Sequence, residues 1–205
     1  MTIELHTWNT PNGRKISVAL EEMGVPYTVK PINISKGEQF ASAFVKISPN
    51  SKIPAIVDPD GPGGKPLTLS QSTAILLYCA EKSGKFMPKD AGARAATYQA
   101  LMSASTDVTP IFGALTAMAN AKPPHDPSVQ AFKDRLQGFF KVWDGFLAKR
   151  KYAAGDEITV ADLSLYAGYA RTKGAQPALL EGLPNLARWA EGMAARPAIQ
   201  RALKF

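Results

Sequence analysis

The chain has 205 residues, of which 45% are hydrophobic, and its formal net charge is +7. This length suits one large domain or two small ones, and the apolar content allows a substantial core. The chain carries one cysteine and two histidines, which argues against a disulfide framework, a CxxC redox pair and a metal site built from these residues. No apolar run approaches the roughly 18 residues of a membrane span, and the first residues lack the layout of a signal peptide. We therefore expect a cytoplasmic protein with no bound metal and no membrane partner.

The positive net charge is compatible with either a nucleic acid or small anions as ligands. The longest basic run is short, at residues 149–151, and basic residues do not alternate with aromatic ones. A nucleic-acid surface normally carries a marked basic cluster or stripe. The sequence therefore predicts no nucleic-acid partner and favours small anionic ligands.

The first half of the chain alternates strand and helix patterns. Residues 3–8 alternate in polarity as a strand does, and Ile16, Leu20 and Met23 then recur at helical spacing until Gly24 ends the helix. The later elements are a strand at 27–34, a short irregular helix at 39–47, an edge strand at 55–58, a strand at 67–69, and a helix at 71–83. The predicted order is βαβαββα.

The loop before the strand at 55–58 restricts the backbone. Pro54 cannot donate to a sheet ladder, so it stands at the start of the strand or in a strand at the edge of the sheet. It also holds Ile53 in an extended geometry. Ile53 then offers a free N–H and C=O at the sheet margin, where a short peptide can pair as a strand does. A cis Ile53-Pro54 bond would turn these groups outward, and the following residues favour it beyond the usual frequency of about 5–6%.

A second binding feature opens the helix at 71–83. Gln71 and Ser72 stand in its first turn, where free N–H groups, an amide and a hydroxyl can hold a carboxylate and an ammonium group. Taken alone, this pair is better explained as an ordinary helix cap. Beside the extended edge at Ile53, the better interpretation is a site for a small peptide with an α-amino acid head.

The second half of the chain, after a polar linker at 88–92, shows helical patterns only. Pro110 should kink or interrupt the first of these helices, and Thr159 and Asp162 have the spacing of a capping box, so Asp162 should be structural. The first apolar stripe consists of Tyr98, Leu101, Met102, Ser105, Val108, Phe112 and Leu115. The second stripe, which we interpret as core, consists of Phe132, Leu136, Phe139, Phe140, Trp143, Phe146 and Leu147. Shorter helices are expected at 185–194 and 198–203.

A βαβαββα unit followed by helices resembles the cytosolic glutathione transferases over essentially the whole chain. The motifs that carry this resemblance are Ile53-Pro54, Gln71-Ser72 and Thr159-Val160-Ala161-Asp162. The resemblance implies an α/β plus all-α protein. Its parts would be a thioredoxin-like glutathione-binding domain at 1–84, a linker at 85–92 and an all-helical glutathione transferase C-terminal domain at 93–205.

Within this superfamily, two segments are similar to the Nu class. They are Thr-Pro-Asn-Gly at 10–13 and the stretch 48–58. Bacterial members of that class resemble disulfide-bond reductases that use glutathione. One departure is Gln71, where such proteins often carry an acidic residue, so we expect a weaker contact with the γ-glutamyl ammonium.

The family places its catalytic residue, usually Tyr, Ser or Cys, at the end of the first strand or in the next helix turn. Residues 8–12 contain none of these, so Thr10 and Asn12 are the matching candidates. A free thiol has a pKa near 8.5, and a hydroxyl or amide donor near a helix N-terminus favours its charged form. Without the resemblance, residues 10–12 are better explained as a helix cap and turn.

The resemblance also implies the remaining glutathione contacts. The backbone of Ile53, held by Pro54, should pair with the cysteinyl unit, and Gln71 and Ser72 should hold the γ-glutamyl end. The candidates for the glycyl carboxylate are Gln39 and Lys52. For Arg135 a contact with a second glutathione and a solvated helix face are both open, and Cys79 is expected in the core.

Glutathione thus enters as a co-substrate, and three functions remain open. The leading one is an enzyme that reduces disulfides by thiol exchange without a protein cysteine. The second is conjugation of glutathione to small electrophiles in detoxification. The third is a non-catalytic interaction module, which would have no use for the paired Ile53-Pro54 and Gln71-Ser72 motifs. The resemblance further implies a homodimer.

Overall fold

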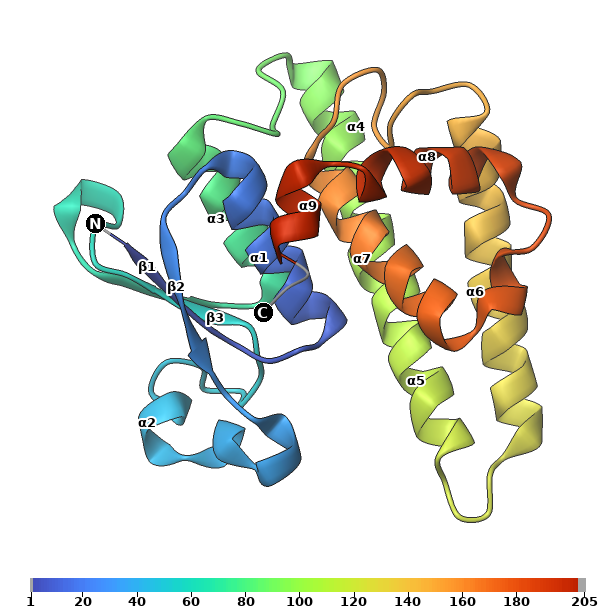
Figure 1. Cartoon of the computed structure of the whole chain (residues 1–205), viewed down its shortest axis with the longest axis horizontal. Helices are drawn as coiled ribbons and strands as arrows, with labels where there is room; N and C mark the ends of the chain where they lie inside the picture. The colour runs from blue at the N-terminus through green and yellow to red at the C-terminus, as the bar shows by residue number, and fades with distance from the viewer. Residues whose placement is uncertain (1, 203–205) are drawn as a thin grey trace. The chain divides into compact units, whose positions relative to one another are not determined.

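The computed structural model describes residues 2–202, and the chain divides into two compact units (Figure 1). The described part of the first unit is 2–87 with 195–202, and the second unit is 88–194. A compact unit is not the same as a functional domain, so the domain boundaries expected at 84 and 93 stay predictions.

The first unit is built on a four-stranded mixed sheet with the strand order β2-β1-β3-β4. Strand β1 runs parallel to β2 and antiparallel to β3, and β3 runs antiparallel to β4. The strands are β1 (Ile3–Thr7), β2 (Tyr27–Pro31), β3 (Ala55–Asp58) and β4 (Leu67–Ser70). The helices are α1 (Pro11–Met23), α2 (Ser42–Val45), α3 (Ser72–Ser83) and, from the end of the chain, α9 (Pro197–Ala202). The predicted thioredoxin-like order βαβαββα is confirmed.

The second strand is shorter than predicted. Strand β2 ends at Pro31, although the apolar pattern extended the prediction to residue 34. The side chain of Asn33 accepts a hydrogen bond from the Ser35 N–H at 3.0 Å, and this starts a 3₁₀ turn at Ile34–Lys36. A local side-chain bond therefore replaces the sheet ladder here. A second 3₁₀ turn follows at Glu38–Phe40.

Helix α1 lies deep in the first unit because α3 and α9 both pack against it. Every residue from Lys15 to Leu20 is buried. Its first turn also approaches the end of β1 closely: a Cβ atom at Gly13 would come within 2.3 Å of the Thr7 hydroxyl oxygen. Only glycine allows this approach, so Gly13 fixes where the helix begins relative to the sheet.

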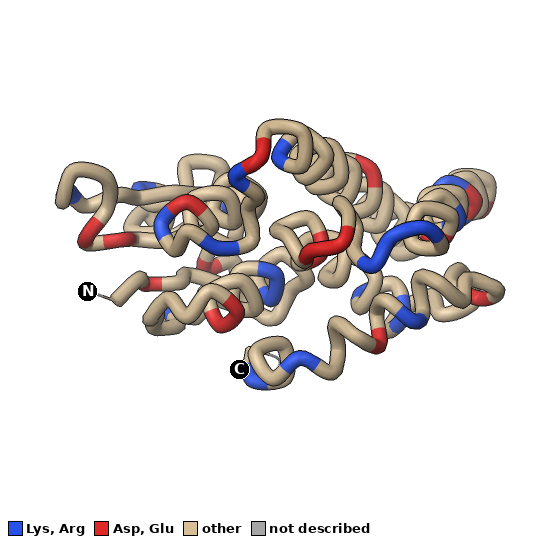
Figure 2. The backbone as a smooth tube through the Cα atoms, turned by 90° about the horizontal axis from the view of Figure 1, so that it is seen from above, with Lys and Arg blue, Asp and Glu red and all other residues tan. Residues whose placement is uncertain are grey.

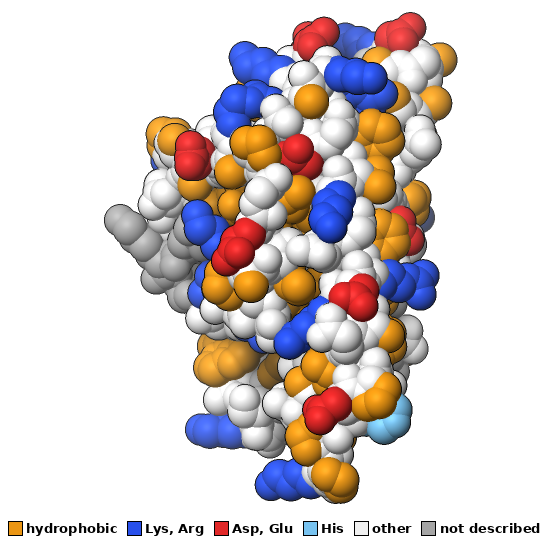
Figure 3. Space-filling model, turned by 90° about the vertical axis from the view of Figure 1, so that its right-hand side faces the viewer, with side chains coloured by type: hydrophobic (Ala, Val, Ile, Leu, Met, Phe, Trp, Pro, Cys, Tyr) orange, Lys and Arg blue, Asp and Glu red, His pale blue; other side chains and the backbone are white. Residues whose placement is uncertain are grey.

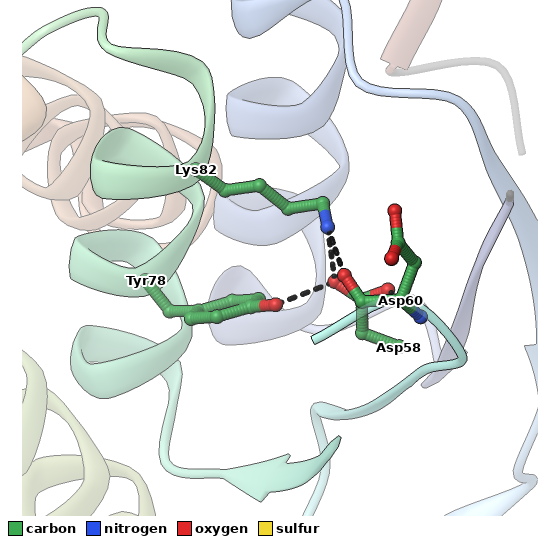
Figure 4. A network of polar contacts seen from close by, with 4 residues as sticks. All are labelled: Asp58, Asp60, Tyr78 and Lys82. Atoms are coloured by element: carbon green, nitrogen blue, oxygen red, sulfur yellow. Dashed lines mark hydrogen bonds and ion pairs between the residues drawn. The ribbon is translucent and has the colours of Figure 1, made fainter. Parts of the chain in front are cut away.

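A polar network anchors the far half of α3 to the end of β3 (Figure 4). The carboxylate of Asp58, only 1% exposed, accepts a hydrogen bond from the Tyr78 hydroxyl at 2.6 Å and pairs with the Lys82 ammonium at 3.0 Å. Burial raises the pKa of Asp58, but the bonds from Tyr78, the Asp60 N–H and Lys82 outweigh it, and the net pKa is lowered. The network holds α3 in place against the sheet.

The second unit is helical, and none of its residues forms an extended strand. Its helices are α4 (Ala91–Met102), α5 (Thr109–Ala119), α6 (Asp126–Leu147), α7 (Val160–Ala175) and α8 (Pro184–Ala194). A π-helical turn at Ser103–Val108 separates α4 from α5, and Pro110 lies in the first turn of α5. The interruption expected at Pro110 is therefore confirmed.

The predicted capping box is present at the start of α7. Thr159 and Asp162 exchange the two reciprocal cap bonds, and Asp162 is fully buried. A second carboxylate, Asp144 of α6, caps α8 by accepting from the backbone N–H groups of Asn185 and Leu186 at 2.8 and 2.9 Å. These bonds satisfy helix ends that would otherwise leave donors unpaired.

Not every residue of the two apolar stripes belongs to the core. Leu136, Phe140, Trp143 and Leu147 of α6 are buried, but Phe146 is 43% exposed, so its assignment to the core was wrong. Phe146 lies at the edge of the buried stripe, where its ring meets Trp143 edge-on and lies under the Arg150 guanidinium. Tyr98 and Met102 of α4 are likewise 39% and 40% exposed. On the face in Figure 3, hydrophobic side chains alternate with charged ones.

Three bulk properties can be read from the described part of the chain. Figure 2 shows Lys and Arg interspersed with Asp and Glu along both units. Among residues 2–202, no helix combines the length and the apolar character that a membrane span needs. The same residues contain no group of three or more His, Cys, Asp or Glu side chains arranged to hold a metal ion.

Candidate functional site

The register of the sheet brings the predicted binding segments to one edge. His6 pairs with Ala55, and Ala55 pairs with Ser70, so the end of β1, the start of β3 and the end of β4 are adjacent. Pro31 at the end of β2 pairs with Thr7 at the same edge. The segments that leave or enter the sheet here contain Thr10 and Asn12, Lys52 to Pro54, Gln71 and Ser72, and, further along the loop after β2, Gln39.

A buried serine holds the loop before β3. Ser48 is fully buried, and its hydroxyl donates to the Lys52 C=O at 2.8 Å and accepts from the Lys52 N–H at 3.4 Å. The Ile53-Pro54 bond is cis. Within residues 2–202, the N–H and C=O of Ile53 make no hydrogen bond. The loop therefore presents an unpaired backbone segment next to the sheet, as the sequence predicted.

Thr10 is the N-cap of α1, and its hydroxyl oxygen accepts from the Gly13 N–H at 3.2 Å. This is the helix-cap role considered as the alternative explanation. A hydroxyl that accepts a hydrogen bond still has a proton to donate, so the cap does not prevent Thr10 from meeting a ligand. The loop behind it is braced by the Arg14 guanidinium, which donates to the Asn9 amide oxygen at 2.6 Å.

The start of α3 differs slightly from the prediction. The helix begins at Ser72, and Gln71 is its N-cap with a φ of 73° and no side-chain cap bond. A residue other than glycine in this region costs on the order of 1–3 kcal/mol and is common at functional sites. The side chain of Gln71 is exposed, and the first N–H groups of α3 are not capped by it. The N-terminus of a helix favours anions.

Side chains from α1 and α3 meet at this edge. The Ser72 hydroxyl donates to the Asn12 amide oxygen at 3.4 Å, and the Lys15 ammonium donates to the Ser72 hydroxyl oxygen at 3.4 Å. The structure thus joins a proposed catalytic residue, a proposed binding residue and a lysine. Lys15 is only 2% exposed, and this burial lowers its pKa to about 8.

Sequence reasoning missed Lys15. The one signal is its place in α1, three residues after Asn12 and next to Ile16 of the apolar stripe. A lysine in that place usually bends outward to solvent. Its burial depends on how the unit packs around α1, and α9, which packs on α1, comes from the other end of the chain. Local spacing cannot show this.

The remaining predicted residues lie in different surroundings. Lys52 is exposed, and Gln39 lies in the 3₁₀ turn Glu38–Phe40 with a buried amide oxygen that finds no partner among residues 2–202. Arg135 belongs to the second unit, on an exposed part of α6. Cys79 is fully buried in α3, as expected, and burial raises the pKa of its thiol to about 12.

Two family models match the chain. The model described as the glutathione S-transferase N-terminal domain matches residues 10–82, and the model of the glutathione S-transferase C-terminal domain matches residues 108–204. The first match contains every proposed binding residue except Arg135, which lies in the second. Together the two matches cover most of the chain.

Proteins of known sequence or structure are similar over nearly the whole length. The disulfide-bond oxidoreductase YfcG of Escherichia coli strain K12 is 35% identical over 98% of this chain and 94% of its own. A glutathione transferase family member from Pseudomonas fluorescens pf-5, solved with two glutathione molecules bound, has a TM-score of 0.94 at 32% identity and covers 99% of this chain and 92% of its own. A glutathione transferase from Pseudomonas putida, solved with glutathione disulfide, has a TM-score of 0.94 at 31% identity, with 100% and 91% covered.

Proposed function

The chain belongs to the glutathione S-transferase family, and from this premise we propose that it binds glutathione at the sheet edge described above and uses it to reduce disulfides. The observation that carries the proposal is the gathering of an unpaired peptide edge, two helix N-termini and the donors Thr10 and Asn12 at that edge. The similarity to a disulfide-bond oxidoreductase supports it.

In the proposed binding mode, each part of glutathione meets a different segment. The cysteinyl backbone pairs with the free N–H and C=O of Ile53. The γ-glutamyl carboxylate meets Ser72 and the first N–H groups of α3, and its ammonium meets the Gln71 amide. Lys52 and Gln39 contact the glycyl carboxylate. Arg135 is the candidate contact for a second glutathione molecule.

The chemistry follows from the donors near the sulfur. Thr10 and Asn12, with the N-terminus of α1, favour the thiolate of glutathione over its thiol. This thiolate attacks one sulfur of a disulfide, so that a mixed disulfide forms and one thiolate leaves. A second glutathione thiolate attacks the mixed disulfide, which releases the other thiolate and forms glutathione disulfide. Two glutathione molecules are oxidised for each disulfide reduced, and no protein sulfur takes part.

Side-by-side rates with glutathione test this function. We expect faster reduction of hydroxyethyl disulfide than conjugation of chlorodinitrobenzene. Thr10→Ala should slow the disulfide reaction by about tenfold for each 1.36 kcal/mol of lost transition-state stabilisation. Thr106→Ala is the matched control, since Thr106 is exposed and lies in the second unit. Clearly faster conjugation, or unchanged rates in Thr10→Ala, would contradict the assignment.

Conjugation to a small electrophile is the second candidate, since it also needs a stabilised thiolate at the same place. The absence of Tyr, Ser and Cys from residues 8–12 favours disulfide exchange, because exchange develops negative charge on two sulfurs in turn and profits from several donors. A non-catalytic interaction module is the third candidate. Retention on immobilised glutathione, followed by elution with free glutathione, would argue against it.

We further propose that the protein is a cytoplasmic homodimer. Apolar side chains remain exposed in both units: Phe40 is 69% exposed in the first, and Tyr98 and Met102, one turn apart on α4, are 39% and 40% exposed in the second. A two-fold pairing of copies would cover such side chains. Sedimentation equilibrium at micromolar concentration should give twice the chain mass of 22.0 kDa, and a mass near that of one chain would exclude the dimer.

A further inference from the structure

A lysine lies buried behind the proposed ligand-binding end of α3. Lys15 is 2% exposed, and among residues 2–202 no carboxylate forms an ion pair with its ammonium group. Its one hydrogen bond within that part of the chain goes to the Ser72 hydroxyl oxygen at 3.4 Å. A buried charge normally has a close partner of opposite sign. The Lys15 ammonium has no such partner among the residues that the structure describes.

The direction of the hydrogen bonds follows from the chemistry of the ammonium group. An ammonium can only donate, so the Ser72 oxygen accepts from Lys15 and its proton is available to another acceptor. In the structure that acceptor is the Asn12 amide oxygen at 3.4 Å. Both bonds are longer than the usual 2.7–3.2 Å. The Ser72 proton can therefore turn from Asn12 to a stronger acceptor such as a carboxylate, while Lys15 continues to donate.

The charged groups on the elements around α1 are engaged elsewhere. These pairs are Arg196 with Glu22, Arg201 of α9 with Glu21, Lys82 of α3 with Asp58, and Lys30 of β2 with Glu4 of β1. Arg14, the neighbour of Lys15 on α1, donates to Asn9, and Glu81 of α3 is exposed. Burial is the cause of the lowered pKa of Lys15, and no charged group among residues 2–202 contributes to it.

We propose that Lys15 is a positioning residue for the γ-glutamyl carboxylate of glutathione, and that it acts through the Ser72 hydroxyl as the buried counter-charge of that carboxylate. This proposal rests on the proposed binding mode and adds the residue that provides the positive charge. Donation from an ammonium polarises the hydroxyl and strengthens its bond to the ligand. The weakly screened interior strengthens the attraction between ammonium and carboxylate.

The proposal has a consequence that a structural lysine would not share. Because the bound carboxylate favours the charged form of Lys15, binding raises the pKa of this lysine above about 8. Near pH 8 the protein must then take up protons when the ligand binds. By the same linkage, affinity is highest where Lys15 is already charged and falls as the pH rises through 8.

The experiment is calorimetry with S-methylglutathione, which has no thiol to titrate, at pH 8 in two buffers of different ionisation enthalpy. The proteins are the wild type, Lys15→Met, Lys15→Arg and the control Lys65→Met. Lys65 is exposed in the loop that joins β3 to β4, at the opposite edge of the sheet. Thermal unfolding of each variant verifies that it is folded.

We expect Lys15→Met to bind roughly tenfold more weakly and to take up fewer protons than the wild type. Lys15→Arg, whose charge does not titrate, should retain more affinity than Lys15→Met and show the same reduced uptake. Lys65→Met should match the wild type, and the ligand ammonium contributes equally to all. Equal affinity or equal proton uptake in a folded Lys15→Met would overturn the proposal while leaving the proposed function intact. No binding by the wild type would overturn both.

Discussion

Lys15 in the first unit and Asp162 in the second are both buried ionisable side chains, but they differ in the hydrogen bonds that compensate for their burial. Asp162 is fully buried and accepts from the N–H groups of Ala153 and Thr159 at 2.8 and 2.9 Å, and from the Trp189 indole at 2.9 Å. Burial raises its pKa, and these bonds oppose the shift. Within residues 2–202, Lys15 has one long bond, and no charged group there opposes the effect of burial on its pKa.

The difference separates a structural charge from one that is ready for a ligand. The partners of Asp162 come from the loop before α7, from its cap and from α8, so the carboxylate joins three segments and needs nothing further. Lys15 joins α1 to α3 through one long bond, at the N-terminus of α3. The number and length of hydrogen bonds thus indicate which buried charge serves the fold and which serves binding.

The largest effect on stability is expected at Asp162, the buried charge whose hydrogen bonds are complete. Asp162→Ala should lower the free energy of unfolding by about 3–5 kcal/mol, because it leaves the buried N–H groups of Ala153, Thr159 and the Trp189 indole without an acceptor. Urea denaturation measures this, with Asp156→Ala as the control, since Asp156 is exposed in the same unit. A loss no greater than that of the control would mean that Asp162 is not the structural centre proposed here.

The next largest effect is expected on glutathione binding beside Lys15. Ser72→Ala should weaken glutathione binding by about 1.5–3 kcal/mol, because it removes the hydroxyl between Lys15 and the ligand carboxylate. Calorimetry with Ser83→Ala, at the other end of the same helix, provides the control. The double variant with Lys15→Met should lose less than the sum of the two single losses, since both act through one hydroxyl. Additive losses would show that Lys15 acts independently of Ser72.

The role of Asp162 could be predicted from the sequence, whereas the burial of Lys15 could not. Thr159 and Asp162 are three residues apart, so the capping box is a local pattern that one stretch of chain displays. The partner Trp189 comes from a distant helix and was not foreseen. The sheet shows the same contrast. The bounds of the strand at 55–58 were predicted to the residue, since Pro54 marks its start, but its place at the edge of the sheet was wrong, because β3 pairs with both β1 and β4. Strand β2 stops three residues early at a local Asn33 turn.

The proposed site was predicted as a set of motifs, and the sheet register then placed those motifs at one edge. Lys15 was missed because the spacing of Asn12, Lys15 and Ile16 is that of any amphipathic helix with a solvated lysine. Phe146 was misplaced for the opposite reason, since seven apolar residues on α6 cover more than the face that packs. In both cases the packing of other helices decides whether the side chain is buried, and helical spacing alone does not predict that packing.

The third prediction concerns how stability depends on pH through Lys15. Its pKa is about 8 in the folded protein and 10.5 ordinarily, so between these values the unfolded chain binds more protons than the folded one. The free energy of unfolding must then rise with pH in this window, by about 1 kcal/mol from pH 8 to pH 9. Other groups titrate nearby, so the measurement is the difference between wild type and Lys15→Met in urea denaturation at each pH. A difference that does not change with pH would indicate that Lys15 is not buried in solution.

The smallest effect is expected at Cys79, the only thiol in the chain. It is fully buried, and burial raises its pKa from 9.0 to about 12, so at neutral pH it is a protonated core side chain and not a nucleophile. Cys79→Ala should therefore retain most of the turnover of hydroxyethyl disulfide, with a stability loss of about 1 kcal/mol from the smaller side chain.

Because the folded pKa of Cys79 lies above the ordinary value, the thiol's contribution to stability is complete below pH 9 and is lost as the pH rises toward 12. The wild type should accordingly lose more stability than Cys79→Ala between pH 9 and pH 10. Loss of the disulfide activity alone in this variant, with its fold intact, would show that a protein thiol takes part and would replace the proposed exchange between two glutathione molecules.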